Sequence, residues 1–397
     1  MFMRTRRWIG GSAALVVLLA PLVVARPASS TPDRTVKTTL VAPGVVHKKI
    51  VAPAWPNRIN VLEIDPSTSA TIDVALATGA LNGRAVTSEI ARRHGAVAAI
   101  NGSFVEAWGR PSGLFAEDGR LMTSALYREV LFAPSADEKS FRIGRFPLKI
   151  RVSNPSVSAL PLAVNTWNEE KLGAGQIGGY TPAGAGHIAV PRDTCSVRLS
   201  APSNATWGPS GNGVVRVHDV EARRCAWKPL RAARTTVLAA RRGSAAARSL
   251  KSFSIGDQVR ITWSVGLPHL FDAVGGSPRL IAEGAVVATR CNEYVCQRHP
   301  RTGVGVTTSG KVLFVTVDGR QSGYSIGMDT VDFAREFKRL GAVEAINLDG
   351  GGSTTMVVRG QVVNRPSGGY QRRVGHALLV LKGRDQAEPY MPWSQTP

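Results

Sequence analysis

Residues 341–356 read GAVEAINLDGGGSTTM, and residues 95–104 carry an earlier version of the same pattern, GAVAAINGSF. Each copy follows a segment in which apolar residues recur at helical spacing, 88–94 before the first and 331–340 before the second. The glycine that opens each copy suits the left-handed residue with which many helices end. A short apolar run follows in both. The sequence therefore predicts two helix–glycine–strand units.

Polar residues and glycines follow the two predicted strands. Asn101 ends the first strand, and Asn347 ends the second, which continues through Asp349 into three glycines, Gly350, Gly351 and Gly352. In α/β proteins such strand ends present side chains and backbone N–H groups at the edge of the sheet where ligands bind. We therefore expect these residues to surround one site. The alternative is a pair of turns that use glycine only for its geometry.

The composition is that of a globular protein, with 43% hydrophobic and 19% charged residues in a chain of 397. Alternating apolar residues mark 29–94 as an N-terminal β-rich segment. Residues 131–265 are rich in Gly, Pro and Ser and contain short strand-like runs, which predicts a β-rich insertion within a domain that spans 95–382. We expect a mixed α/β (α+β) fold with a central β-sheet flanked by helices, followed by a loose tail at 383–397.

The first 28 residues have the features of a secretory signal peptide. The basic start contains Arg4, Arg6 and Arg7, and residues 13–24 form an apolar stretch that is short for a membrane span and interrupted by proline. The sequence therefore predicts a secreted or cell-wall-associated protein. An uncleaved membrane anchor is the alternative, and it would be the chain's one contact with a membrane.

Four cysteines agree with export, because disulfides persist in oxidising compartments. We expect the local pairs Cys195–Cys225 and Cys291–Cys296, although sequence alone leaves the other pairings open. Neither pair has the CxxC spacing of a thiol-bound metal site. The seven histidines are dispersed without an HExxH motif, so no cofactor is evident and a divalent metal is left open.

The net charge of +21 indicates which kinds of molecule the protein could bind. A secreted protein this basic is expected to adhere to anionic polymers such as phosphate-bearing cell-wall glycans, unless the charge is a general property of its surface. Nucleic acid is not an expected partner, because the basic residues are scattered and no recognition motif is present.

Two carboxylates, Asp318 and Asp349, end predicted strands, and such a pair can protonate a leaving group and assist a nucleophile. Turn capping is the alternative role for each. Glycine N–H groups and the guanidinium fork of arginine bind phosphate oxygens. We therefore predict the catalytic residues Asp349, Asp318, Asn101 and Asn347, and a binding set of Gly276, Arg301, Thr302, Arg320, Gly350, Gly351, Gly352 and Ser353.

Several of these segments together resemble, in order, the phosphodiester glycosidase family: NGSF (101–104), GGSPRL (275–280), RT (301–302), DGR (318–320), GM (327–328) and INLDGGGS (346–353). The resemblance spans about 95–382 and is strongest over 272–382. It implies hydrolysis of a sugar-1-phosphate diester, which frees the sugar and leaves phosphate on the other partner. Ser103 and Asp332 depart from the family pattern, which leaves the substrate open. Asp332 also lies near a predicted helix start, where capping explains it.

We therefore predict a secreted hydrolase of glycosyl phosphodiesters whose substrate is a glycan or sugar phosphate. Two alternatives are a non-catalytic binder of phosphorylated cell-wall glycans and an enzyme of exopolysaccharide synthesis or transfer, in which a sugar hydroxyl replaces water.

Overall fold

The structure, a computed structural model, describes residues 34–383 except 54–55, 119, 125–129, 135–139, 146–148, 156–160, 170, 182–192, 201–209, 221–224, 226–234, 265–271 and 292. The predicted signal peptide at 1–28 and all but the first residue of the predicted tail at 383–397 lie outside these ranges. No helix in the described ranges is long and apolar enough to cross a membrane.

The predicted fold class, a central sheet flanked by helices, is wrong. Across the described ranges the chain forms four β-sheets and three α-helices, and β12–β13 is the one parallel pair of named strands. The two helix–glycine–strand units suggested crossover connections of the α/β kind. Both helices do make such crossovers, but each passes over one antiparallel strand, so the strand of each motif pairs with antiparallel neighbours on both sides.

Two of the sheets face each other across the main core. Sheet 1 has the order β1 (Thr35–Ala42), β2 (Val45–Ala52), β3 (Asn57–Ile64), β22 (Val312–Val317), β21 (Arg301–Thr307), β23 (Ala342–Asn347), β19 (Arg279–Ala282), β20 (Ala285–Val286). Sheet 2 has the order β25 (Gln361–Val362), β24 (Met356–Val358), β5 (Ala98–Asn101), β26 (His376–Lys382), β4 (Ala70–Leu76). Their inner faces share one apolar cluster that includes Phe314, Ile346, Ile100 and Leu378. Alternate residues of each strand thus close a sandwich.

A helix covers part of the outer face of each of these sheets. On sheet 2, α1 (Thr87–Arg93) buries Ile90 and Ala91, and on sheet 1, α3 (Thr330–Arg339) buries Phe333 and Phe337. The glycines after the two helices have φ values of 63° and 89°, as expected for left-handed helix ends. The helix–glycine–strand motif thus occurs twice, once on each side of the sandwich.

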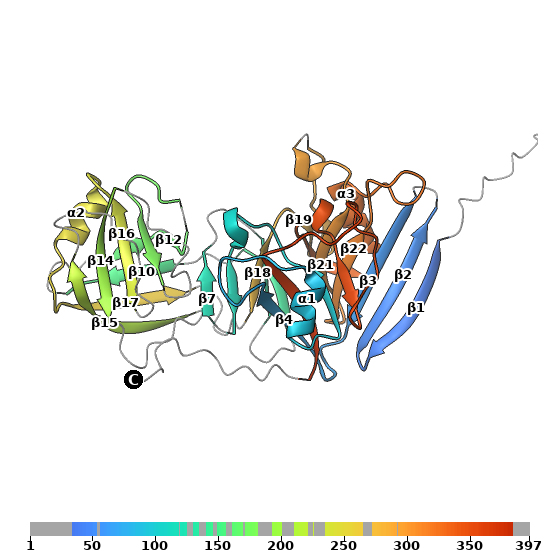
Figure 1. Cartoon of the computed structure of the whole chain (residues 1–397), viewed down its shortest axis with the longest axis horizontal. Helices are drawn as coiled ribbons and strands as arrows, with labels where there is room; N and C mark the ends of the chain where they lie inside the picture. The colour runs from blue at the N-terminus through green and yellow to red at the C-terminus, as the bar shows by residue number, and fades with distance from the viewer. Residues whose placement is uncertain are drawn as a thin grey trace, which may run out of the picture.

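Sheet 3 is small and contributes to the main core through Phe115 and Val274. Its order is β7 (Arg120–Thr123), β6 (Phe115–Glu117), β18 (Ala273–Gly276), β8 (Val130–Pro134), β9 (Phe141–Gly144). In Figure 1, β7 and β18 lie between the sandwich on the right and sheet 4 on the left.

Sheet 4 takes all its strands from residues 149–264, and a second apolar cluster around Trp167 and Leu238 joins it to Ala273 of sheet 3. Its order is β11 (Leu162–Val164), β10 (Lys149–Ser153), β17 (Gln258–Ser264), β15 (Ser210–Val220), β14 (Thr194–Ser200), β16 (Thr235–Arg241), β13 (Ile177–Tyr180), β12 (Thr166–Trp167). The helix α2 (Ala245–Lys251) packs on it through Ala247 and Leu250.

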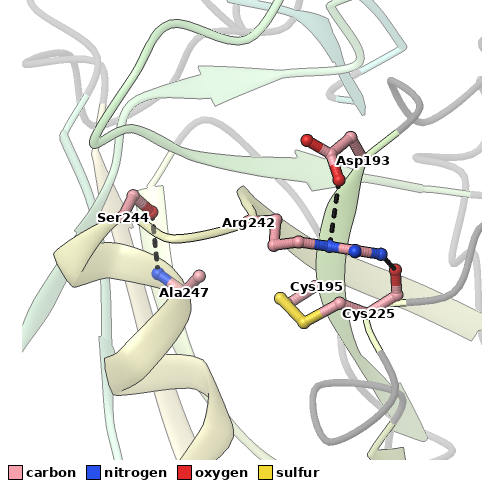
Figure 2. Close-up of a disulfide and its surroundings, with 6 residues drawn as sticks. All are labelled: Asp193, Cys195, Cys225, Arg242, Ser244 and Ala247. Carbon is pink, nitrogen blue, oxygen red and sulfur yellow. Dashed lines mark hydrogen bonds and ion pairs between the residues drawn. A yellow bond between two sulfur atoms is a disulfide. The ribbon is translucent and has the colours of Figure 1, made fainter.

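The Cys195–Cys225 disulfide lies in this sheet, as Figure 2 shows. Arg242, in the turn after β16, donates to the Cys225 carbonyl at 2.7 Å and pairs with Asp193 at 2.9 Å. Its guanidinium therefore links that turn to Cys225 and to the residue that precedes β14. Ser244 caps α2 by accepting from the backbone of Ala247 at 3.0 Å. The second predicted pair, Cys291–Cys296, is also bonded. Both bonded pairs are the ones expected, out of the pairings that the sequence had left open.

Candidate active site

A cavity of about 130 Å³ opens where β23 ends and the triple-glycine loop begins. Its wall contains one carboxylate, Asp349, and three arginines. The lining residues are Phe104, Tyr294, Val295, His299, Pro300, Arg301, Arg320, Asn347, Asp349, Gly350, Gly351, Gly352 and Arg372. Of the predicted catalytic residues, the cavity thus brings together Asp349 and Asn347.

The burial of Asp349 raises the pKa of its carboxyl above the ordinary value. A hydrogen bond from Ser353, the charge of Arg372 and the backbone N–H of Gly350 oppose that shift. These partners favour the charged form of Asp349, and burial makes a charge at this position a strong local electrostatic source.

Asn101 supports Asp349 from outside the cavity lining. Its Nδ2 donates to the carbonyl oxygen of Asp349 at 2.7 Å, and its Oδ1 accepts from Thr302 Oγ1 at 2.9 Å and from the Thr355 backbone at 3.0 Å. Because Thr302 belongs to sheet 1 and Asn101 to sheet 2, this buried network ties the two halves of the sandwich together directly behind Asp349.

Asn347 occupies the equivalent position in the second motif but is used differently. Its Nδ2 donates to the carbonyls of Ser277 and Leu348, each at 2.8 Å, which fixes the orientation of the amide. Its Oδ1 is buried and has no hydrogen-bond partner among the described residues. Asn347 therefore offers the cavity an acceptor, whereas both polar atoms of Asn101 are already engaged.

Two exposed arginines lie over the glycine loop. A Cβ at Gly351 would come within 3.0 Å of Arg320 Nη2, and a Cβ at Gly352 would come within 2.4 Å of Arg372 Nη2. The backbone N–H of Gly351 already donates to the Pro300 carbonyl at 2.9 Å, and that of Gly350 serves Asp349. The glycines thus act chiefly by leaving room for guanidinium groups, rather than by presenting a row of free N–H groups.

His299 and Tyr294 form the opposite part of the wall. Their ring centroids are 4.3 Å apart, and Arg320 Nη2 lies 2.6 Å from the Tyr294 hydroxyl and 3.3 Å from His299 Nδ1. Burial lowers the pKa of His299, and the charges of Arg320 and Arg301 lower it further. His299 Nε2 is buried without a hydrogen-bond partner among the described residues. A neutral imidazole therefore faces a site rich in cations.

Arg301 lines the cavity, but its guanidinium is engaged elsewhere. Nε donates to the Met328 carbonyl and Nη1 to the Val295 carbonyl, at 2.8 and 2.7 Å, and Nη2 donates to the Gln297 carbonyl. Burial lowers its pKa to about 10. These bonds hold the 294–297 turn, η4 (Tyr294–Cys296) included, against β21, so Arg301 shapes the wall on which Tyr294 sits.

Asp318 is not among the residues that line this cavity. Its carboxylate accepts from Asn364 Nδ2 and the Arg365 backbone, each at 3.0 Å, and lies 3.4 Å from the Tyr324 hydroxyl. Burial raises its pKa to about 6 against the lowering effect of these bonds. The structure thus places Asp318 as an anchor for the 364–365 turn and does not bring it together with Asp349 in the cavity.

The remaining predicted residues surround the site without lining it. Gly276 lies against the backbone of Asn347, since a Cβ there would meet the Asn347 carbonyl at 2.8 Å. Ser353 is buried in η5 (Gly351–Ser353), where it contacts Asp349 and Arg372. Asp332, which the sequence pattern assigned to helix capping, lies away from this cavity: it pairs with Arg298 at 2.7 Å, and Asp329 is the residue that caps α3, by accepting from the Asp332 backbone.

Sequence reasoning missed six wall residues: Phe104, Tyr294, Val295, His299, Pro300 and Arg372. His299 lies two residues before the RT motif and Phe104 ends the first motif, so proximity to these motifs was an available signal for both. Arg372 and Tyr294 lie outside every motif, and only their tertiary position reveals them.

Among the residues that the structure describes, one group of side chains could hold a metal ion. The carboxylates of Asp73, Asp118 and Asp272 have ligand atoms within 4.8 Å of one another. Burial raises the pKa of Asp272 well above its ordinary value, and the charge of Asp73 raises it further. None of the three lines the cavity around Asp349.

Comparison with known proteins gives the same family as the sequence motifs. A sequence model described as phosphodiester glycosidase matches residues 212–381. The chain is 37% identical over 91 residues to the SPbeta prophage-derived uncharacterized protein YomE of Bacillus subtilis (strain 168), an alignment that covers 23% of this chain and 14% of that protein. It is 33% identical over 102 residues to N-acetylglucosamine-1-phosphodiester alpha-N-acetylglucosaminidase of Bos taurus, covering 24% and 19%. The chain thus aligns with less than a fifth of either relative.

A solved structure shares the fold. The crystal structure of a hypothetical protein from Synechocystis superposes with a TM-score of 0.70 at 21% identity, covering 87% of this chain and 63% of that one. This likeness concerns the fold alone. The family resemblance predicted from the motifs is confirmed by the sequence match: over residues 212–381 this chain matches the phosphodiester glycosidase family.

Proposed function

We propose that the chain hydrolyses a glycosyl phosphodiester in the cavity around Asp349, releasing the sugar and leaving the phosphate on its other partner. The observation that carries this proposal is the composition of the wall, which has a single carboxylate beside Arg301, Arg320 and Arg372. The similarity to phosphodiester glycosidases supports the same class of substrate.

The charge pattern suits a phosphate leaving group. Ordinary glycosidases use two carboxylates, one of which protonates the departing sugar oxygen. A phosphate monoester has a second pKa near 6, so it can depart without receiving a proton. Such a leaving group needs cations rather than an acid, and Arg320 and Arg372 supply them over the glycine loop. The absence of Asp318 from the lining is therefore compatible with this reaction.

Asp349 then acts on the sugar. Cleavage of the bond between C1 and the phosphate oxygen develops positive charge at C1, which a buried carboxylate stabilises or attacks. Water then adds a hydroxyl to C1, displacing Asp349 where it has attacked, and its other proton passes to the released phosphate or to solvent. The orphaned Oδ1 of Asn347 is placed to accept a hydrogen bond from a sugar hydroxyl or from that water. Asn101 and Thr302 position Asp349 without touching the substrate.

Export is part of the proposal. Both disulfides support an oxidising compartment, and the N-terminal signal features agree with it. Substrate screening must identify the sugar and the group on the other side of the phosphate. It must also test whether a cell-wall polymer is the natural substrate.

The test is a screen of α-glycosyl phosphodiesters with the purified chain in ¹⁸O-labelled water. Release of sugar with the label on C1 supports the proposed C1–O cleavage. Label in the phosphate would show cleavage of the P–O bond and refute the glycosidase assignment. Tight binding without turnover for every diester would instead support the non-catalytic binder, and transfer of the sugar to added glycan without its hydrolysis would support the transfer enzyme.

A further inference from the structure

A second and larger cavity, of about 450 Å³, lies beside α3 and the start of β1. It is separated from the first by one stretch of chain: Arg298 lines the second cavity, and His299 and Arg301 line the first. Met328 also lines the second, and its carbonyl receives Arg301 Nε at 2.8 Å. The two cavities are therefore neighbours on either side of residues 298–301.

The wall of the second cavity is strongly basic. Two carboxylates, Asp332 and Glu336, stand among five arginines: Arg34, Arg290, Arg298, Arg335 and Arg339. Because the wall also includes the buried residues Asn57 and Glu336, it is a hollow and not a flat charged surface.

Each carboxylate is shared by two arginines. Glu336 receives Arg34 and, at 3.1 Å, Arg339, while Asp332 receives Arg298 at 2.7 Å and Arg335 at 3.4 Å. Asp329 adds a third carboxylate, 3.7 Å from Arg290. Five cations thus share three anions, so this group of side chains keeps a positive charge.

We propose that this second cavity binds a phosphodiester segment of an anionic glycan chain. Arginine forks match phosphate oxygens in geometry and charge, and an excess of two cations suits a ligand that brings more than one phosphate. The loop between Arg290 and Arg298, closed by the Cys291–Cys296 disulfide, contributes side chains to both cavities. A polymer held in the second cavity therefore passes next to the first. This binding does not depend on the hydrolysis proposed above.

The test uses Arg290 and Arg335, whose side chains are 69% and 54% exposed, so that their removal leaves the buried Glu336 paired. The double variant Arg290→Ala/Arg335→Ala is compared with Arg92→Ala/Arg248→Ala, which removes the same charge from exposed positions on α1 and α2. Dissociation constants for synthetic poly(glycerol phosphate) are measured by calorimetry with the full chain at fixed salt. We expect binding about tenfold weaker for the first variant and within about twofold of wild type for the control.

Equal weakening in both double variants would show general charge attraction and overturn the site. Unchanged binding in Arg290→Ala/Arg335→Ala would overturn it too. Arg290→Lys/Arg335→Lys, which keeps the charge but loses the planar fork, is expected to bind with intermediate affinity and guards against misfolding as the cause. Asp349→Asn is expected to bind the polymer as the wild type does. Polymer binding can therefore be judged separately, even if the proposed hydrolysis is disproved.

Discussion

The side-chain amide of Asn101 donates to the main-chain carbonyl of Asp349, 248 residues further along the chain, at 2.7 Å. Asn347 is the residue that matches Asn101 in the repeated motif, yet its amide oxygen has no partner in the described part of the chain. The two copies of the motif therefore have different roles. The first copy builds the support behind the carboxylate, and the second provides the carboxylate and an open acceptor.

Asn101→Asp tests the support. The substitution replaces the donor to Asp349 by an oxygen and places a buried acid against the carbonyls of Gly102 and Asp349. We expect a loss of stability of about 2–4 kcal/mol, measured by urea denaturation, together with a loss of activity. Wild-type stability and turnover would show that the contact does not position Asp349.

Asp349→Asn tests the chemistry. Burial already penalises the charged form of this carboxyl, so removing the charge is expected to leave the melting temperature nearly unchanged. Turnover of a glycosyl phosphodiester is expected to fall by about 10²-fold or more, because a charge that stabilises the transition state is lost. Asp318→Asn, outside the cavity lining, is the companion variant, and a smaller loss is expected there. Full activity in both would disprove the catalytic assignment, and a larger loss in Asp318→Asn would reverse the two roles.

Arg372→Gln tests the electrostatics through pH. The positive charge of Arg372 lowers the pKa of Asp349, which burial has raised, so its removal moves that pKa upward. Activity that requires ionised Asp349 is lost as pH falls through this pKa. The acid limb of the kcat/KM profile is therefore expected to move to higher pH in Arg372→Gln. Arg373→Gln removes the same charge one residue away, and an equal movement in that control would assign the effect to general charge.

The Cys291–Cys296 disulfide closes the loop that carries Tyr294 to the cavity. Replacing both cysteines by serine is expected to raise KM several-fold, because the wall beside Arg320 loses a constraint. Replacing Cys195 and Cys225, which lie in sheet 4, is expected to lower stability by about 2–4 kcal/mol with little change in KM. Steady-state kinetics and thermal melting separate the two effects, and the reverse pattern would contradict the assignment of the 291–296 loop to the site.

Asp318 is expected to make stability fall with rising pH. Its pKa is about 6 in the folded chain against 3.8 as the ordinary value, so its contribution is present below about pH 4 and is lost as pH rises through about 6. That difference corresponds to roughly 3 kcal/mol. Between about pH 4 and pH 7, the free energy of unfolding of Asp318→Asn is therefore expected to rise relative to wild type. A constant difference between the two proteins in urea titrations would refute the shift.

The sequence by itself determined the features that depend on neighbouring residues. Both helix–glycine–strand units and their left-handed glycines follow from short-range spacing, and they occur as expected. The two expected disulfide pairs are formed as well, although the sequence had left the other pairings open. The same is true of Asp349 and Asn347, which lie in one motif and enter one cavity together. Backbone geometry allows a short run of residues only a few conformations, so the residue pattern of such a run predicts its local structure.

Only the tertiary structure decided how these units are joined and which side chains meet. A helix followed by a strand is compatible with both parallel and antiparallel sheets, and the pairing of β5 and β23 with distant strands settled the matter. Arg301 and Asp318 form hydrogen bonds with residues of other loops, and Arg372 lines the cavity although it lies outside every motif. Hydrogen bonds and burial are set by residues far apart in the chain, and a linear pattern does not record that proximity.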